Sequence, residues 1–273
     1  MENILRRAEH LVDGFINSSA SLRETKTESV FKKTQLHESE YRPDYYLKEE
    51  NYIDNIITNS VIRASLKSIA DKYYNKTIKE IIEHSSKITN TTYPSLYLVI
   101  SKCCTSLNIN NCPSFYITNV LRGINALSME VEGNKYVLLS RRVAAVLSTT
   151  EQSFIIGHEL GHHQQGNLVC HTVNGLLNSF NAKSEIFGPL ISDTIEVPLK
   201  RWCRQSEFNA DRAGLVCCKD INVVKQLFVK LGMIENPTAF NLYQETSEDH
   251  PLLSTRYNEL KSFAKSYKNR LCL

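Results

Sequence analysis

Residues 157–168 read GHELGHHQQGNL, and this stretch places histidine and acidic side chains at a spacing that matters on a helix. His158 and His162 are four residues apart, so on an α-helix both imidazoles project from one face and can occupy two corners of a tetrahedral zinc site. Glu159 lies beside the open corner, where a carboxylate can accept a proton from water and pass it to a leaving amine. The stretch therefore predicts two metal ligands and a general base on one helix.

The residues around these side chains favour a rigid, buried helix. Gly157 and Gly161 each cost ~1 kcal/mol relative to alanine in a helix interior, which is tolerated where a strand or a substrate backbone must come close. The apolar lead-in SFII at 153–156 predicts that the helix packs on a core, as a rigid metal site requires. His163 points about 100° away from His162 and is predicted to be a surface residue or a neighbour of a ligand.

A catalytic zinc site needs a third protein ligand, and residues 204–215, RQSEFNADRAGL, offer one. Glu207 and Asp211 are four residues apart and share a helix face. Glu207 is predicted to be the third ligand, and Asp211 to accept a hydrogen bond from the non-ligating nitrogen of a zinc histidine. The alternative is a solvated acidic face paired with Arg204 and Arg212.

The order of elements around these motifs predicts an α+β fold, mainly helical with a small antiparallel sheet. The two later strands are joined by EGNK, which has the residues of a hairpin turn. The active-site helix is predicted to begin near Thr150 with a threonine cap. The predicted elements are a helix at 95–109, strands at 114–119, 124–133 and 134–140, and then two helices within 141–165.

The first part of the chain is predicted to be separate from this domain. Residues 1–50 are polar and show no apolar period, so partial disorder is expected at the start of a helical N-terminal region, 1–90. Apolar residues at helical spacing from 53 to 82 predict one long or two shorter amphipathic helices. The break TNTTYP at 89–94 then sets the start of a second domain, 91–273.

Composition excludes several other classes of protein. The net charge is +3 over 273 residues, with no block of like charge, so neither nucleic acid nor a membrane surface is an expected partner. No apolar run is long enough to span a membrane, and the start lacks a secretory signal, so the protein is predicted to be cytoplasmic. The eight cysteines include two adjacent pairs and no Cys-x-x-Cys, which predicts reduced, mostly buried thiols.

Taken together, the motifs resemble those of the zinc metallopeptidases of the HtpX and CAAX prenyl protease type. HELGH is followed some forty-five residues later by EFNADRAG, and INALS at 124–128 and DHPLLSTRYNEL at 249–260 resemble the edge strand and the His-Pro motif of that family. The resemblance covers roughly residues 92–265 and implies a zincin-like metallopeptidase domain. The best-known members are embedded in membranes, so the soluble minority is the better comparison.

The resemblance also implies roles for individual residues. It makes His158, His162 and Glu207 the ligands of one Zn²⁺ per chain, Glu159 the general base and Asp211 a partner of a zinc ligand. It places His250 and Arg256 near the metal, where either can stabilise an oxyanion. Substrate would add a strand along Asn125, Ala126 and Leu127. Residues 168–203, interrupted by Gly188-Pro189 and by Pro198, are expected to form a helical hairpin that is either a lid or ordinary scaffold.

The function expected from these features is zinc-dependent endopeptidase activity on protein or peptide substrates. A second hypothesis is a zinc-stabilised binding or regulatory protein, in which a fourth ligand such as His250 or a cysteine closes the metal site, or the N-terminal region masks the cleft. A third is a metallohydrolase that acts on a non-peptide amide, because the same metal and base would serve it.

Overall fold

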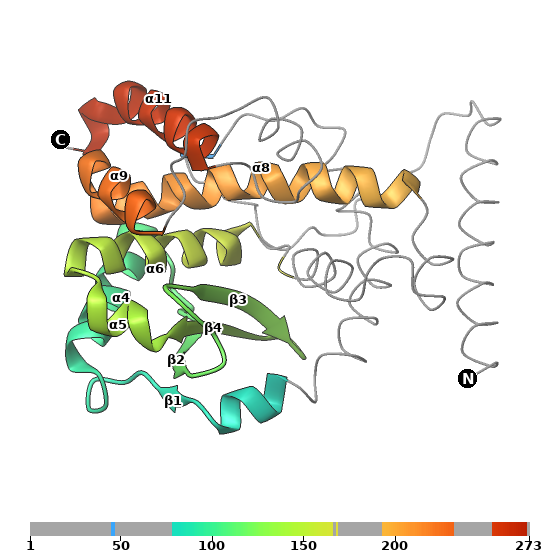
Figure 1. The fold of residues 1–273 in the computed structure, drawn as a ribbon, viewed down its shortest axis with the longest axis vertical. Coiled ribbons are helices and arrows are strands. Elements are labelled where there is room, and N and C mark those ends of the chain that lie inside the picture. The colour runs from blue at the N-terminus through green and yellow to red at the C-terminus, as the bar shows by residue number, and fades with distance from the viewer. Residues whose placement is uncertain (1–44, 47–77, 166–167, 169–192, 232–252, 272–273) are drawn as a thin grey trace, which may run out of the picture.

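The fold has a small sheet at one side, and helices stacked on it in layers (Figure 1). The computed structural model describes residues 45–46, 78–165, 168, 193–231 and 253–271. Helix α6 lies between the sheet and the long helix α8, and α11 packs on α8. This arrangement confirms the predicted α+β class. The elements are β1 (Ser86–Lys87), α4 (Pro94–Ser106), β2 (Ser114–Thr118), β3 (Ala126–Val131), β4 (Asn134–Ser140), α5 (Arg141–Val146), α6 (Thr149–Gln164), α8 (Asp193–Cys218), α9 (Ile221–Lys230) and α11 (Leu253–Leu271).

The sheet is mixed, which corrects the expectation of an antiparallel one. Its strand order is β1-β2-β4-β3, and β2 pairs in parallel with β4 while the other two pairs are antiparallel. The predicted hairpin between β3 and β4 is confirmed, and its turn places Glu132 and Gly133 at φ values of 52° and 80°. Because β4 rather than β3 lies beside β2, strand β3 becomes the edge of the sheet.

Alternating residues of the strands bury the two faces of the sheet against different partners. The main core, shared with α4, α6 and α8, contains Phe115, Val137 and Leu139, whereas a smaller cluster contains Met129 and Leu138.

A helical turn at 78–83 precedes the sheet and adds Ile78, Ile81 and Ile82 to that smaller cluster. The sheet is thus completed by residues that precede the predicted domain boundary at residue 90. The division into two domains itself stays a prediction.

Helix α6 begins at Thr149, one residue before the predicted start, and its cap differs from the predicted threonine. Ser148, not a threonine, is the N-cap: its hydroxyl accepts a hydrogen bond from the backbone N–H of Glu151 (3.4 Å), and the Glu151 carboxylate accepts from the Ser148 N–H (2.8 Å). The Lys230 ammonium lies 2.6 Å from the same carboxylate. This reciprocal capping box fixes the start of α6 and ties it to α9.

Helices α6 and α8 cross at small residues. A Cβ built on Gly161 would lie 2.8 Å from the Ala213 Cβ and 2.9 Å from the Ala210 Cα, and one built on Gly157 would lie 2.7 Å from the Cys217 Sγ. On α8, a Cβ on Gly214 would meet the Phe154 carbonyl oxygen at 2.8 Å. The two α6 glycines therefore accommodate a neighbouring helix rather than a strand or a substrate.

The remaining expectations about the fold have mixed outcomes. Helix α8 runs through Pro198, so this proline does not end a helix as expected. The rest of the predicted lid and most of the predicted helices at 53–82 lie outside the described residues.

The six described cysteines are free, and four are buried. Among the described helices, none is both long and apolar enough to cross a membrane.

Candidate metal centre

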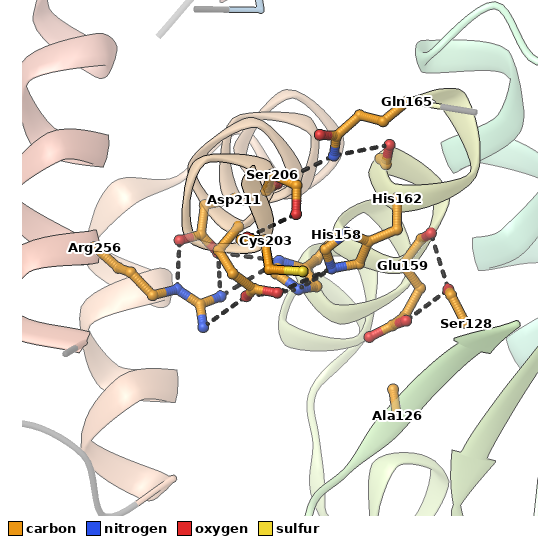
Figure 2. Close-up of polar contacts among 12 residues, drawn as sticks. Ala126, Ser128, His158, Glu159, His162, Gln165, Cys203, Ser206, Asp211 and Arg256 are labelled. Carbon is orange, nitrogen blue, oxygen red and sulfur yellow. Dashed lines mark hydrogen bonds and ion pairs between the residues drawn. The ribbon is translucent and has the colours of Figure 1, made fainter. Parts of the chain in front are cut away.

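Three side chains from two helices converge on one point between α6 and α8. His158 and His162 extend from α6, with their Nε2 atoms 3.1 Å apart (Figure 2). Glu207 belongs to α8. Its Oε1 lies 3.3 Å from His162 Nε2, and its Oε2 lies 3.6 Å from His158 Nε2. The structure thus brings together the three residues that the sequence predicts as ligands.

The spacing of these atoms fits a tetrahedral metal site. Ligands bound at ~2.0–2.1 Å to a tetrahedral zinc ion are separated from one another by roughly 3.3–3.4 Å. Here the two imidazole nitrogens are 3.1 Å apart, and the two oxygens of Glu207 lie 3.3 and 3.6 Å from them. Two imidazole nitrogens and a carboxylate are also the donor set of many catalytic zinc sites. Within the described part of the chain, no other group of three or more such side chains is arranged to hold a metal.

Asp211 lies one turn further along α8 and contacts the outer nitrogen of His158. The distance from His158 Nδ1 to Asp211 Oδ1 is 3.0 Å. Burial opposes the charged imidazole, but the carboxylates of Asp211 and Glu207 raise the pKa of His158 above its usual value. A carboxylate in this position favours the tautomer with hydrogen on Nδ1, which leaves the Nε2 lone pair directed at the metal position.

Arg256 from α11 binds both α8 carboxylates. Its Nε and Nη2 donate to the two oxygens of Asp211 at 2.7 and 2.6 Å, and its Nη1 lies 3.0 Å from Glu207 Oε2. The Arg256 and Asp211 side chains are 12% and 1% exposed, so this bidentate pair is shielded from water. Burial would raise the pKa of Asp211, but the guanidinium lowers it below its usual value.

Glu159 faces the other side of α6, toward the sheet. Its side chain is buried, and its Oε2 accepts a hydrogen bond of 2.6 Å from the hydroxyl of Ser128 on β3 (Figure 2). The same hydroxyl lies 3.0 Å from the Glu159 carbonyl oxygen. In the sequence, Glu159 thus lies between the two histidine ligands. In the structure, its carboxylate lies beside the edge strand.

The profile of peptidase family M48 matches residues 91–264, which include every residue of this cluster. The chain belongs to peptidase family M48. It is 31% identical over 109 residues to the plastoglobule-localized metallopeptidase 48 of Arabidopsis thaliana chloroplasts. That match covers 40% of this chain and 32% of the relative, so the chain spans about a third of the relative's length. No solved structure matches.

Family M48 is a family of zinc metallopeptidases, which agrees with the resemblance found from the motifs. The relative's name places that protein in plastoglobules of the chloroplast. The cytoplasmic location of this chain stays a prediction, as does the absence of a nucleic-acid partner.

The other residues singled out in the sequence have different surroundings. Asn125 precedes the edge strand. Its carbonyl accepts a hydrogen bond from the Ser140 backbone N–H, and its own N–H donates to the Ser140 hydroxyl. Its side-chain oxygen accepts from the Ala126 N–H at 2.8 Å. Leu127 is 46% exposed on β3. His163 is buried rather than on the surface; burial, then the charges of Lys135 and His162, lower its pKa to about 3. His250 lies outside the described residues.

Sequence reasoning missed Ser128 and the ion pairs of Arg256. The alternation of β3 places Ser128 on the same face as Ala126, which was available from the sequence. Its acceptor, 31 residues away on α6, was not. Arg256 lies beside the metal cluster, as the resemblance implied, and its guanidinium contacts Asp211 and Glu207. Its oxyanion role stays a prediction.

Proposed function

We propose that this member of family M48 is a zinc-dependent endopeptidase. The observation that carries the proposal is the convergence of His158, His162 and Glu207 on one point, with Glu159 on the same helix as the histidines. The three donors fit zinc in type and spacing. When bound, zinc supplies Lewis acidity, which polarises a substrate carbonyl and makes water easier to deprotonate.

Glu159 is proposed as the general base. Its carboxylate takes a proton from the attacking water and later gives it to the departing amine. One of its oxygens bonds to Ser128, and the other lies on the side away from that serine (Figure 2). The burial of Glu159 keeps bulk water from competing for the proton.

Strand β3 is the proposed docking edge for the substrate. Among the described strands it is the last of the sheet, so an extended peptide can pair with its outer side at Asn125, Ala126 and Leu127. Main-chain pairing of this kind holds a peptide with little regard to its sequence, which suits an endopeptidase. The exposed side chain of Leu127 is available for an apolar contact with the substrate.

Arg256 and His250 are given separate roles in the proposal. The contacts of Arg256 support the role of holding Asp211 and Glu207 in place, in preference to the oxyanion role implied by the resemblance. The oxyanion role is left to His250, and replacing it by alanine should lower kcat without loss of zinc.

The deciding experiment measures zinc content and cleavage of an unfolded protein such as casein. One zinc per chain together with cleavage, and retention of zinc without cleavage in Glu159→Gln, is the expected result. Zinc without any cleavage by the wild-type chain would favour a binding or regulatory protein. Within the described residues, the metal group has three members, so a cysteine that closes the site finds no support there.

Masking by the N-terminal region stays a proposal, and the structure suggests where to truncate. Tyr45 is buried in the main core, where its hydroxyl donates to the Gln164 side chain and its carbonyl accepts from Arg212. A chain that begins at Asp44 keeps these contacts and removes the preceding residues. A rise in the rate of casein cleavage on this truncation is the outcome expected if residues 1–43 of the N-terminal region mask the cleft.

A further inference from the structure

Strand β3 carries a buried serine on the face that it turns toward α6. Ser128 is 7% exposed, and it shares this face with Ala126, whereas Met129 and Val131 belong to the cluster on the opposite face of the sheet. A buried hydroxyl is costly unless it finds a hydrogen-bond partner. The partner of Ser128 is therefore the reason for a polar residue at this position.

The stronger partner is the carboxylate of Glu159. Ser128 Oγ lies 2.6 Å from Glu159 Oε2 and 3.0 Å from the Glu159 carbonyl oxygen. A hydroxyl has one hydrogen to donate, and 2.6 Å is the length typical of an O–H donor bound to a carboxylate. Ser128 thus donates a hydrogen bond to one carboxylate oxygen of Glu159, and the other oxygen takes no part in this contact.

We propose that Ser128 is a positioning residue that holds Glu159 in the orientation needed for proton transfer, an inference that rests on the function proposed above. A free glutamate side chain has several rotamers, and only some of them direct an oxygen toward the reacting water. A small misplacement of a catalytic group can cost as much as ~100-fold in rate. Because Ser128 lies on the same strand as the proposed docking edge, it also couples the position of the substrate to that of the base.

The competing explanation is that Ser128 only spaces β3 from α6. In that case its loss would shift the docking edge, which raises KM and lowers stability, and any residue of similar size would serve. A positioning role instead changes kcat with little change in KM, and it requires a hydroxyl. The two explanations therefore differ in a measurable way.

The test uses the full-length zinc-loaded chain, with kcat and KM measured on a peptide from a casein cleavage site. Ser128→Ala and Ser128→Cys are each expected to lower kcat about tenfold, with KM within twofold and zinc content unchanged. Ser128→Thr keeps the hydroxyl and is expected to recover most of kcat. Ser266→Ala is the matched control, because the Ser266 hydroxyl bonds to a carbonyl within α11, and its kcat should equal that of the wild type.

Several outcomes would overturn the inference. Unchanged kcat in a folded alanine or cysteine variant does so, as does a rise in KM alone. If the alanine variant does not fold, the cysteine variant, which nearly preserves the volume, decides. If only the positioning role of Ser128 is wrong, the wild type is active and Glu159→Gln is inactive. If the endopeptidase proposal is wrong, the wild type itself is inactive.

A second readout does not depend on activity. In the zinc-free chain, Ser128→Ala should lower the thermal midpoint of unfolding, and it should lower it less in a Glu159→Ala background, since the contact is then already lost. Equal shifts in both backgrounds would show that the Ser128–Glu159 contact contributes nothing in solution.

Discussion

On the side of α6 that faces α8, the functional side chains are held by a dense network. On the side that faces β3, one serine holds the general base within the part of the chain that the structure describes. The two histidines and Glu207 are backed by Asp211 and Arg256, through contacts of 2.6–3.6 Å. The Glu159 carboxylate has one contact of 2.6 Å to Ser128.

This difference follows from what the two sides have to do. A metal site needs ligands that stay fixed in number and direction, so its supporting residues are themselves paired and buried. A general base must give and take a proton within each turnover, and one held oxygen leaves the other available. Variants on the two sides of α6 should therefore separate loss of metal from loss of proton transfer.

Glu207→Ala removes the ligand that α8 contributes to the metal cluster. Two imidazoles alone do not complete a catalytic zinc site, so we expect loss of stoichiometric zinc and of all cleavage. Metal analysis after dialysis measures the first, and casein cleavage the second. Glu80→Ala, a change at an exposed glutamate, is the control. Full zinc content in Glu207→Ala would contradict the assignment.

Glu159→Gln should have the complementary effect on the β3 side. The amide cannot accept the proton from water, so turnover is expected to fall by ~10²–10⁴-fold. Zinc content should be that of the wild type, because Glu159 is not one of the three converging ligands. If zinc is lost as well, the two sides of α6 are not separable in the way described.

Asp211→Asn should weaken the metal site without destroying it. The amide keeps the shape of the side chain but loses the charge that pairs with Arg256 and favours one tautomer of His158. Removing such a partner typically costs ~10–100-fold in metal affinity, which competition with a chelator measures. Asp220→Asn at the N-cap of α9 is the control, since asparagine caps equally well. Unaltered affinity in Asp211→Asn would count against the network.

Gly161→Ala tests the close crossing that brings the network to the histidines. The new Cβ would lie 2.9 Å from a backbone atom, the Ala210 Cα, so the helices must separate. Overpacking of this kind costs about 1–3 kcal/mol, which equals or exceeds the ~1 kcal/mol gained from helix propensity. Urea unfolding gives the free energy. A variant more stable than the wild type would show that the crossing can open freely.

Glu151→Ala should have the smallest effect, at the capped start of α6. Loss of the capping box is expected to cost about 1 kcal/mol at pH 7. Burial would raise the pKa of Glu151, but Lys230 and the hydrogen bonds from Ser148 lower it below its usual value. The carboxylate therefore contributes fully above the ordinary glutamate pKa of ~4.3, and its contribution is lost as the pH falls through the depressed pKa of the folded state. The difference in stability between variant and wild type should shrink in acid. A difference that widens in acid would contradict a lowered pKa of Glu151 in the folded state.

Much of this molecule could be predicted from the sequence because the relevant constraints are local. A spacing of four residues puts His158 and His162 on one helix face wherever that helix lies, and the same holds for Glu207 and Asp211. Alternating apolar residues fixed the strands, and the turn at Glu132-Gly133 fixed the hairpin. The family motifs then related the two helices to each other.

Only the tertiary structure decided how these local units meet. The parallel pairing of β2 with β4, the contact between Ser128 and Glu159, and the pairing of Arg256 with Asp211 join residues that are 22 to 45 positions apart in the chain. Periodicity gives the direction of a side chain around its own helix or strand, but not the partner that packing brings to it. That choice depends on the strand order of the sheet and on how α6 packs on β3 and α11 packs on α8, which are properties of the packed molecule.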